Sequence, residues 1–102
     1  MIIIQASMTA KPGQRDRAVA AFNQAMQGSQ AEPGCDTYRY TIDLGNPNLF
    51  HIVELWEDEA ALLGHLQGEP FKQFMAVMGE LVDPVGMSAY AGQMAPYSFP
   101  MG

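Results

Sequence analysis

Apolar and polar residues alternate with two different periods along the chain, and each change of period marks a predicted element. Residues 2–8 are rich in β-branched side chains and alternate imperfectly, which indicates a strand partly buried on both faces. Apolar residues then recur every three or four positions, which predicts a long helix that opens near Pro12 and ends at Glu32-Pro33-Gly34. The stripe of this helix consists of Ala18, Phe22, Ala25, Met26 and Ser29.

The middle of the chain has a period of two, which is typical of strands with two unlike faces. Residues 35–44 form the first such segment, and Tyr38 and Tyr40 fall on the same face of it. A turn cluster at 45–48 separates it from residues 49–56, so the two segments predict a hairpin. In the second strand one face is predicted to hold Phe50, Ile52, Glu54 and Trp56, and the other His51, Val53 and Leu55.

The final part of the chain predicts two helices and a last strand. Acidic residues 57–59 suit a helix amino terminus, and we expect this helix to run through Leu66 and end at Gly68. A second helix is predicted to begin at Pro70 and to stop where Asp83-Pro84 breaks the chain, before a short strand at 85–91. Its core stripe consists of Phe71, Phe74, Met78 and Leu81.

The order of these elements predicts one α+β domain over residues 1–92 with a ferredoxin-like, split βαβ topology. In this arrangement a four-stranded antiparallel sheet carries helices on one face. The other face needs a further layer, and sheet-to-sheet pairing with an identical chain supplies it, so we expect a homodimer. Residues 93–102 are predicted to form an irregular C-terminal tail that contacts the partner subunit.

Composition excludes several classes of protein. The net charge of −6 and the five scattered basic residues provide no stripe for a phosphate backbone, so we expect no nucleic acid partner. No segment approaches the roughly 20 apolar residues of a membrane span, and the amino-terminal run at 1–4 is interpreted as a strand and not a signal peptide. Cys35 is the single cysteine, which excludes an intrachain disulfide and fits a cytoplasmic protein.

Two residues are candidates for proton transfer, His65 and Glu54. His65 falls on or beside the apolar stripe of its helix and should point toward the sheet, either as a core histidine bonded to a carboxylate or carbonyl or as a group that exchanges protons. Glu54 lies between Ile52 and Trp56 on one strand face, so it must find a donor or shift its pKa upward. His65 or Arg39 could be that donor.

Aromatic residues supply the candidate walls of a binding site, although packing alone also explains them. We expect Trp56 and His65 to border a common void inside the subunit. His51 should face the dimer side without a role, and two histidines with no third ligand predict no metal site. No Ser-His-Asp arrangement is evident. The candidate substrate-binding residues are Trp56, Tyr38, Phe22, Phe50, Phe71 and Phe74.

Three stretches in this order and spacing resemble the antibiotic biosynthesis monooxygenase superfamily of dimeric α+β barrels. They are Glu32-Pro33-Gly34-Cys35 with Tyr38, then Glu54-Leu55-Trp56-Glu57, then residues 60–66 with Phe71. The resemblance covers roughly residues 1–92. It implies cofactor-independent oxygenation of phenols, hydroquinones or anthrones in some members, haem breakdown in others, and isomerisation of small sugar-derived signals in others.

By this resemblance, the family's strand tryptophan corresponds to Trp56 and its helix histidine to His65. The sequence departs from the family pattern at three places. Ile52 stands where the anthrone oxygenases have asparagine, and Gln5 or Ser7 stands where haem-degrading members have asparagine. Pro70 replaces a histidine that many relatives place before the phenylalanine. These differences count against haem degradation and leave the catalytic set incomplete.

The leading functional hypothesis is a monooxygenase without metal or flavin that acts on a small phenolic, hydroquinone or polyketide-like aromatic and on dioxygen. His65 would be the base, and the aromatic residues would exclude water. A first alternative is an isomerase in which the same histidine shuttles a proton. A second is a dimer that binds a ligand without converting it.

Overall fold

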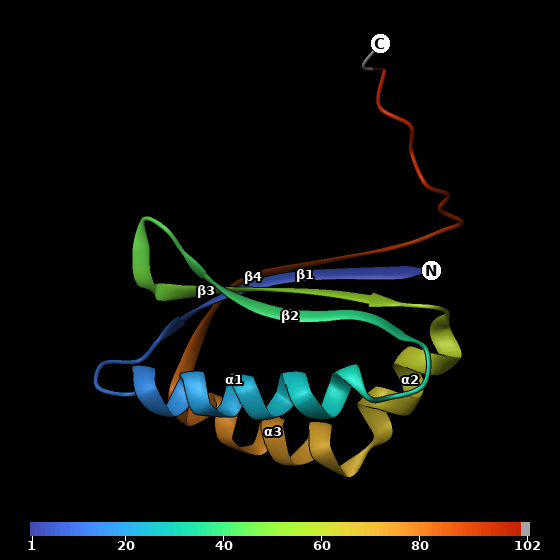
Figure 1. Ribbon diagram of the computed structural model, residues 1–102. Coiled ribbons are helices and arrows are strands. Elements are labelled where there is room, and N and C mark those ends of the chain that lie inside the picture. Colours follow the sequence, from blue (N-terminus) through green and yellow to red (C-terminus); the bar gives the residue numbers. More distant parts are fainter. Residues whose placement is uncertain (101–102) are drawn as a thin grey trace.

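A computed structural model describes residues 1–100 as a four-stranded antiparallel sheet with three helices against one of its faces (Figure 1). The strand order is β2-β3-β1-β4, so the first and third strands lie in the centre and β2 and β4 form the edges. This arrangement confirms the predicted ferredoxin-like α+β fold. The elements are β1 (Ile2–Ala10), α1 (Arg15–Gln30), β2 (Cys35–Asp43), β3 (Asn46–Trp56), α2 (Glu59–Gln67), α3 (Glu69–Leu81) and β4 (Val82–Ala91).

The strand register assigns each side chain to one of the two sheet faces. Ile4 of β1 pairs with Glu54, and Ser7 pairs with His51, so alternate pairs point to opposite faces. The helix-covered face of β3 holds Phe50 and Trp56, which are almost fully buried. The face prediction for this strand is therefore confirmed.

Two apolar clusters fill the space between the sheet and the helices. The first joins α1, α3 and the sheet around Phe22 and Phe50, whose ring centroids are 5.0 Å apart. The second surrounds Trp56 at the other end of the sheet, with Tyr38 and Ile52. Burying an aromatic or aliphatic side chain of this kind contributes about 1.5–3 kcal/mol. Between them the two clusters fix the helices over the sheet.

Three predicted boundaries are wrong, all at prolines. The strand expected at 49–56 begins at Asn46, inside the predicted turn cluster, so Pro47 lies within β3. The first helix begins at Arg15, because Pro12 and the positive-φ Gly13 (φ 75°) form the turn before it. Asp83-Pro84 does not break the chain but lies within β4 beside a register shift opposite Met8. An edge strand tolerates proline at such an irregularity, because its outer side needs no backbone donor.

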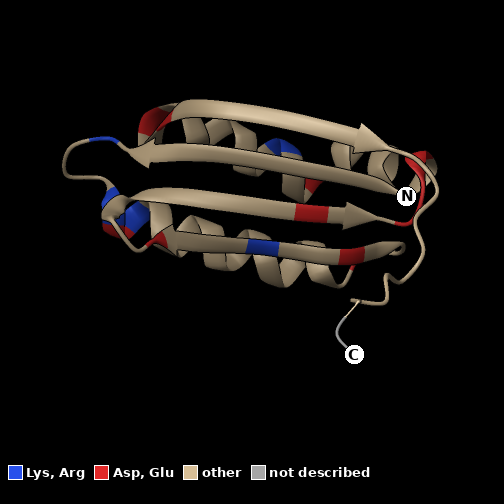
Figure 2. Ribbon diagram, turned by 90° about the horizontal axis from the view of Figure 1, so that it is seen from above, with Lys and Arg blue, Asp and Glu red and all other residues tan. Residues whose placement is uncertain are grey.

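The strands of the sheet carry few charged residues (Figure 2). Residues 93–100 contain no helix or strand, and Figure 1 shows them leaving the sheet on the side away from the helices. The last two residues of the predicted tail lie outside the described residues. Within residues 1–100, the helices are all too short or too polar to cross a membrane.

Candidate active site

The helix α2 holds His65 in its last turn and aims the imidazole at the sheet. Asp58 caps the start of this helix, and its carboxylate accepts a hydrogen bond from the Ala61 backbone N–H over 2.8 Å. His65 is 3% exposed, although its helix is mostly at the surface. Its Nδ1 lies 2.7 Å from Glu32 Oε1. Because a carboxylate only accepts, Nδ1 carries the proton and Nε2 is left as the acceptor.

Aromatic rings surround the imidazole of His65. Its ring centroid lies 4.7 Å from that of Trp56 and 4.9 Å from that of Phe71. Tyr38 follows at 5.6 Å. A histidine enclosed in this way is shielded from water on the sheet side, so its contacts with Glu32 and with a ligand are less screened than at the surface.

A cavity of about 490 Å³ lies beside this ring, between α1 and α3. Its volume falls within the roughly 300–1,000 Å³ typical of small-molecule sites. It opens to the surface where Gln24 of α1 and Gln73 of α3 are exposed. Within residues 1–100, Nε2 of His65 has no protein partner, and His65 lines this cavity. The lining consists of Ala21, Gln24, Ala25, Gly28, Ser29, Tyr38, His65, Pro70, Phe71, Gln73, Phe74 and Val77.

Two titratable side chains line the cavity, Tyr38 and His65. Burial, followed by the charge of Glu54, raises the pKa of Tyr38 to about 12. Its hydroxyl therefore stays protonated at neutral pH. Burial raises the pKa of Tyr40 as well. His65 is the other titratable residue in the lining, and its Nδ1 is bonded to Glu32.

Glu54 finds its donor in Trp56 and not in His65 or Arg39. The indole Nε1–H donates to Glu54 Oε1 over 3.0 Å. Arg39 is exposed on the opposite face of the sheet, where β2 pairs it with Val53. Burial raises the pKa of Glu54, partly offset by the hydrogen bond from the indole. The expectation of an upward shift is confirmed, and both expected donors were wrong.

The structure separates the candidate site residues into two groups. Tyr38, His65, Phe71 and Phe74 line the cavity. Trp56 is fully buried behind His65 and does not border the cavity. The imidazole of His65 lies between the indole and the cavity, so the expectation that the two side chains border a common void was wrong. Glu54 is also absent from the lining, and the first apolar cluster holds Phe22 and Phe50.

Sequence reasoning missed Glu32, the partner of His65. The two residues are 33 positions apart, and no periodicity connects them. A turn at Gly34 (φ 77°) lets the chain pass close to α2, where an added Cβ would lie 2.5 Å from that of Ala61. The signal that could have found Glu32 is therefore the Glu-Pro-Gly turn, because it places a carboxylate just before the glycine that approaches the helix.

Comparison with known proteins places the chain in a family. Residues 1–77 match the family described as antibiotic biosynthesis monooxygenase. The chain belongs to this family. A curated Bacillus subtilis relative named "Putative monooxygenase YcnE" is 34% identical over 82 residues, which span 80% of this chain and 86% of the relative.

Solved structures of similar proteins share the whole fold. An antibiotic biosynthesis monooxygenase family structure from Deinococcus radiodurans superimposes with a TM-score of 0.87 at 24% identity, over 97% of this chain and 99% of the other. Protein PA3566 from Pseudomonas aeruginosa gives a TM-score of 0.82 at 28% identity, over 91% and 94%. Family and fold are thus established, and neither comparison identifies a substrate.

Proposed function

We propose that this family member is a homodimeric monooxygenase that needs no metal or flavin and oxidises a small phenol, hydroquinone or polyketide-like aromatic. One observation carries the proposal: His65 presents its free Nε2 to a cavity of about 490 Å³ while Glu32 holds Nδ1 at 2.7 Å. Glu32 also stabilises the imidazolium that forms when Nε2 takes a proton. The pair can therefore deprotonate a bound phenol.

The reaction uses the substrate anion as the electron donor. Nε2 of His65 removes the phenolic proton, and the anion passes one electron to dioxygen. The resulting radicals combine in a carbon–oxygen bond, and the imidazolium returns its proton to the terminal oxygen of the peroxide. Breaking the oxygen–oxygen bond with loss of water then gives the oxidised aromatic product.

The aromatic residues take two roles in this proposal. Tyr38, Phe71 and Phe74 line the cavity and bind the substrate ring, with the protonated Tyr38 hydroxyl available as a donor. Trp56 keeps water from the back of His65, and Glu54 acts through the indole as a positioning residue. The packing that holds this wall in place comes from Phe22 and Phe50.

The open sheet face and the tail support the homodimer. Tyr90 is 64% exposed there, and Val53 is also exposed on the same face. The tail adds Tyr97 and Phe99, each 73% exposed, on the side that a second copy would cover. Two sheets packed face to face would bury these apolar groups.

Oxygen uptake with a panel of hydroquinones, in air and without it, tests the chemistry. The His65→Gln variant should lower uptake by about 100-fold, because it removes the base and keeps much of the side-chain volume. Gln67→Ala, an exposed change on the same helix, is the matched control and should leave uptake unchanged. Conversion without air would instead indicate the isomerase, and binding without conversion would indicate a ligand-binding dimer.

A further inference from the structure

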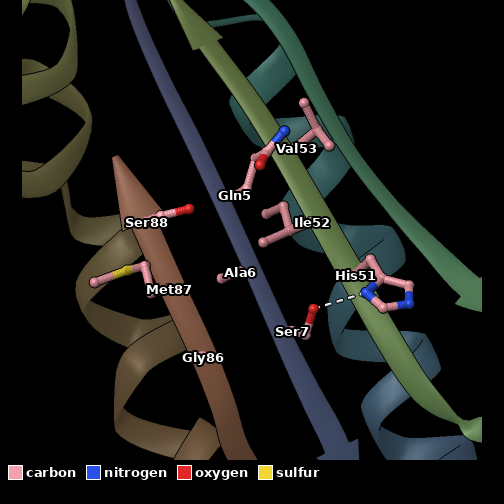
Figure 3. A pocket seen from close by; sticks show the side chains of 9 residues that line it. All are labelled: Gln5, Ala6, Ser7, His51, Ile52, Val53, Gly86, Met87 and Ser88. Carbon is pink, nitrogen blue, oxygen red and sulfur yellow. Dashed lines mark hydrogen bonds between the residues drawn. The ribbon is translucent and has the colours of Figure 1, made fainter. Parts of the chain in front are cut away.

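Hollows of about 490 Å³ lie on both faces of the sheet. On the open face, His51 Nδ1 lies 2.7 Å from Ser7 Oγ (Figure 3), and its Nε2 lies 2.9 Å from Asp43 Oδ1. Strand register assembles this Ser-His-Asp arrangement, so the expectation that the chain has none was wrong. The proposed homodimer would cover this hollow with a second sheet, whereas the cavity beside His65 opens on the helix side. A ligand can therefore reach His65 in the homodimer.

The two helices that form the walls of the cavity beside His65 run in opposite directions (Figure 1). Near the start of α3, the ring centroid of Phe71 lies 4.9 Å from that of His65. One turn later, the ring centroid of Phe74 lies 6.4 Å from that of Phe22 in the middle of α1. The cavity therefore extends from a buried end at His65 toward the middle of both helices.

Polar side chains occur at two levels of this cavity. The inner level holds His65, with Tyr38 at 5.6 Å between ring centroids and with Ser29, which is 6% exposed. The outer level holds Gln24 of α1 and Gln73 of α3, which are both exposed. Gln24 precedes Ser29 by five positions, which corresponds to about 7.5 Å along the helix axis. A single aromatic ring with an oxygen at each end fits between the two levels.

The charged groups that act on the cavity are carboxylates. Among the described residues, none of the chain's five Lys and Arg side chains belongs to the lining. Glu32 lies 2.7 Å from His65, and Glu54 is partly buried nearby. Burial raises the pKa of Tyr38 most, and the charges of Glu54 and then Glu32 raise it further. A carboxylate ligand would therefore be repelled and would find no cation to pair with.

A neutral phenol avoids this repulsion. When its proton moves to Nε2 of His65, a phenolate and an imidazolium form together, so the net charge inside the cavity does not change. A carboxylated phenol adds a negative charge on binding, before any proton moves. Removing such a charge from water without a partner is costly. The cavity therefore favours neutral aromatics over carboxylated ones.

We infer that Gln24 and Gln73 bind the second oxygen of a neutral para-hydroquinone whose first oxygen faces Nε2 of His65. This inference rests on the proposed function and narrows its substrate class. A carboxamide both donates and accepts hydrogen bonds, so the two glutamines can bind the second hydroxyl without a charge. A phenol that lacks this oxygen loses these hydrogen bonds. Gln24 and Gln73 therefore determine the specificity of the site.

Isothermal titration calorimetry without oxygen compares hydroquinone, 4-methylphenol and 2,5-dihydroxybenzoate as probes. We expect hydroquinone to bind about 3- to 10-fold more tightly than 4-methylphenol, which lacks the second oxygen. 2,5-Dihydroxybenzoate should bind at least about 10-fold more weakly than hydroquinone, because it adds a carboxylate. The double variant Gln24→Ala/Gln73→Ala should lose the preference for hydroquinone and keep the affinity for 4-methylphenol.

Gln24→Arg should change the selectivity for charge. Its guanidinium can pair with the carboxylate of 2,5-dihydroxybenzoate, so the affinity for this probe should rise at least about 10-fold. Asn23→Arg is the matched control, because it adds the same charge at the preceding position of α1, which is exposed and outside the lining. An equal rise in both variants would contradict the place of Gln24 at the ligand.

Gly28→Leu tests where the aromatic ring binds. Gly28 belongs to the lining, and an added Cβ there would meet no atom within 4 Å, so a larger side chain can enter the cavity. The variant should weaken the binding of hydroquinone. Gly79→Leu is its control, because an added Cβ in this part of α3 also meets no atom within 4 Å and the residue lies outside the lining.

The comparison of probes on the wild-type protein needs no substitution, and thermal unfolding shows whether each variant keeps its fold. Equal affinities for hydroquinone and 4-methylphenol, tighter binding of 2,5-dihydroxybenzoate, or no binding of hydroquinone at millimolar concentration would overturn the inference. Because these measurements exclude oxygen, the expected preference without later oxygen uptake would contradict the proposed monooxygenase alone. Oxygen uptake without that preference would contradict the role of the two glutamines alone.

Discussion

The two faces of the sheet hold the same chemical unit in opposite surroundings. On the helix-covered face, His65 is bonded to Glu32 over 2.7 Å and is 3% exposed. On the open face, His51 is bonded to Asp43 over 2.9 Å with its side chain 38% exposed. Each histidine borders a hollow of about 490 Å³.

The two histidine–carboxylate pairs differ in the other groups that contact the imidazole. His65 has aromatic neighbours and a free Nε2, which suits removal of a proton from a bound aromatic ligand. His51 has both nitrogens hydrogen-bonded, Nδ1 to the Ser7 hydroxyl and Nε2 to the Asp43 carboxylate. A histidine–carboxylate pair therefore does not define a reaction by itself, because the third group decides what receives or gives the proton.

The largest effect on stability is expected on the helix-covered face of the sheet. Trp56→Ala should lower the free energy of unfolding by about 3–5 kcal/mol, because it leaves a cavity behind His65. Val53→Ala on the open face removes a smaller side chain, which the proposed dimer would cover, and should cost less, about 1–2 kcal/mol. Urea unfolding of both variants measures the ratio, and equal losses would contradict the asymmetry of the two faces.

A smaller effect is expected from two glycines that differ in what an added methyl group meets. Gly34→Ala should destabilise the protein by about 1–2 kcal/mol or more, because φ is positive and the new Cβ would clash with Ala61. Gly28→Ala in α1 meets open space and should stabilise by about 0.4–1 kcal/mol. Thermal unfolding gives both signs.

Gly34→Ala also tests whether oxygen uptake depends on the contact between Glu32 and His65. Gly34→Ala should lower oxygen uptake, because it displaces the turn that carries Glu32 to His65. A destabilised variant with undiminished uptake would show that Glu32 is not needed.

The fold could be predicted because the period of apolar residues, two in strands and three to four in helices, is a local property of the sequence. Residues 49–56 are an example, since both faces of this strand are as predicted. It was insufficient for the hydrogen-bond partners. Glu32 reaches His65 through a turn, and Ser7 reaches His51 through register, so both contacts depend on tertiary geometry. Trp56 shows the same limit: its face was predictable, but the side chain between it and the cavity was not.

The smallest effect is a pH dependence at Glu54. Its raised pKa means that the folded protein binds this proton more tightly than the unfolded chain, so its contribution to stability is present below the unfolded pKa and is lost as pH rises through the folded pKa. Glu54→Gln keeps an oxygen for the Trp56 indole and removes that loss. The variant should be more stable than wild type at neutral pH, and the gap should narrow as pH falls. A gap that is constant with pH would contradict the shift.

The most direct test of the central claim is an NMR titration of the two histidine imidazoles with a hydroquinone under anaerobic conditions. Binding in the cavity between α1 and α3 should shift the His65 signals and leave those of His51 in place. Shifts confined to His51, or none for either ring at millimolar ligand, would contradict the claim that the helix-covered face holds the aromatic substrate.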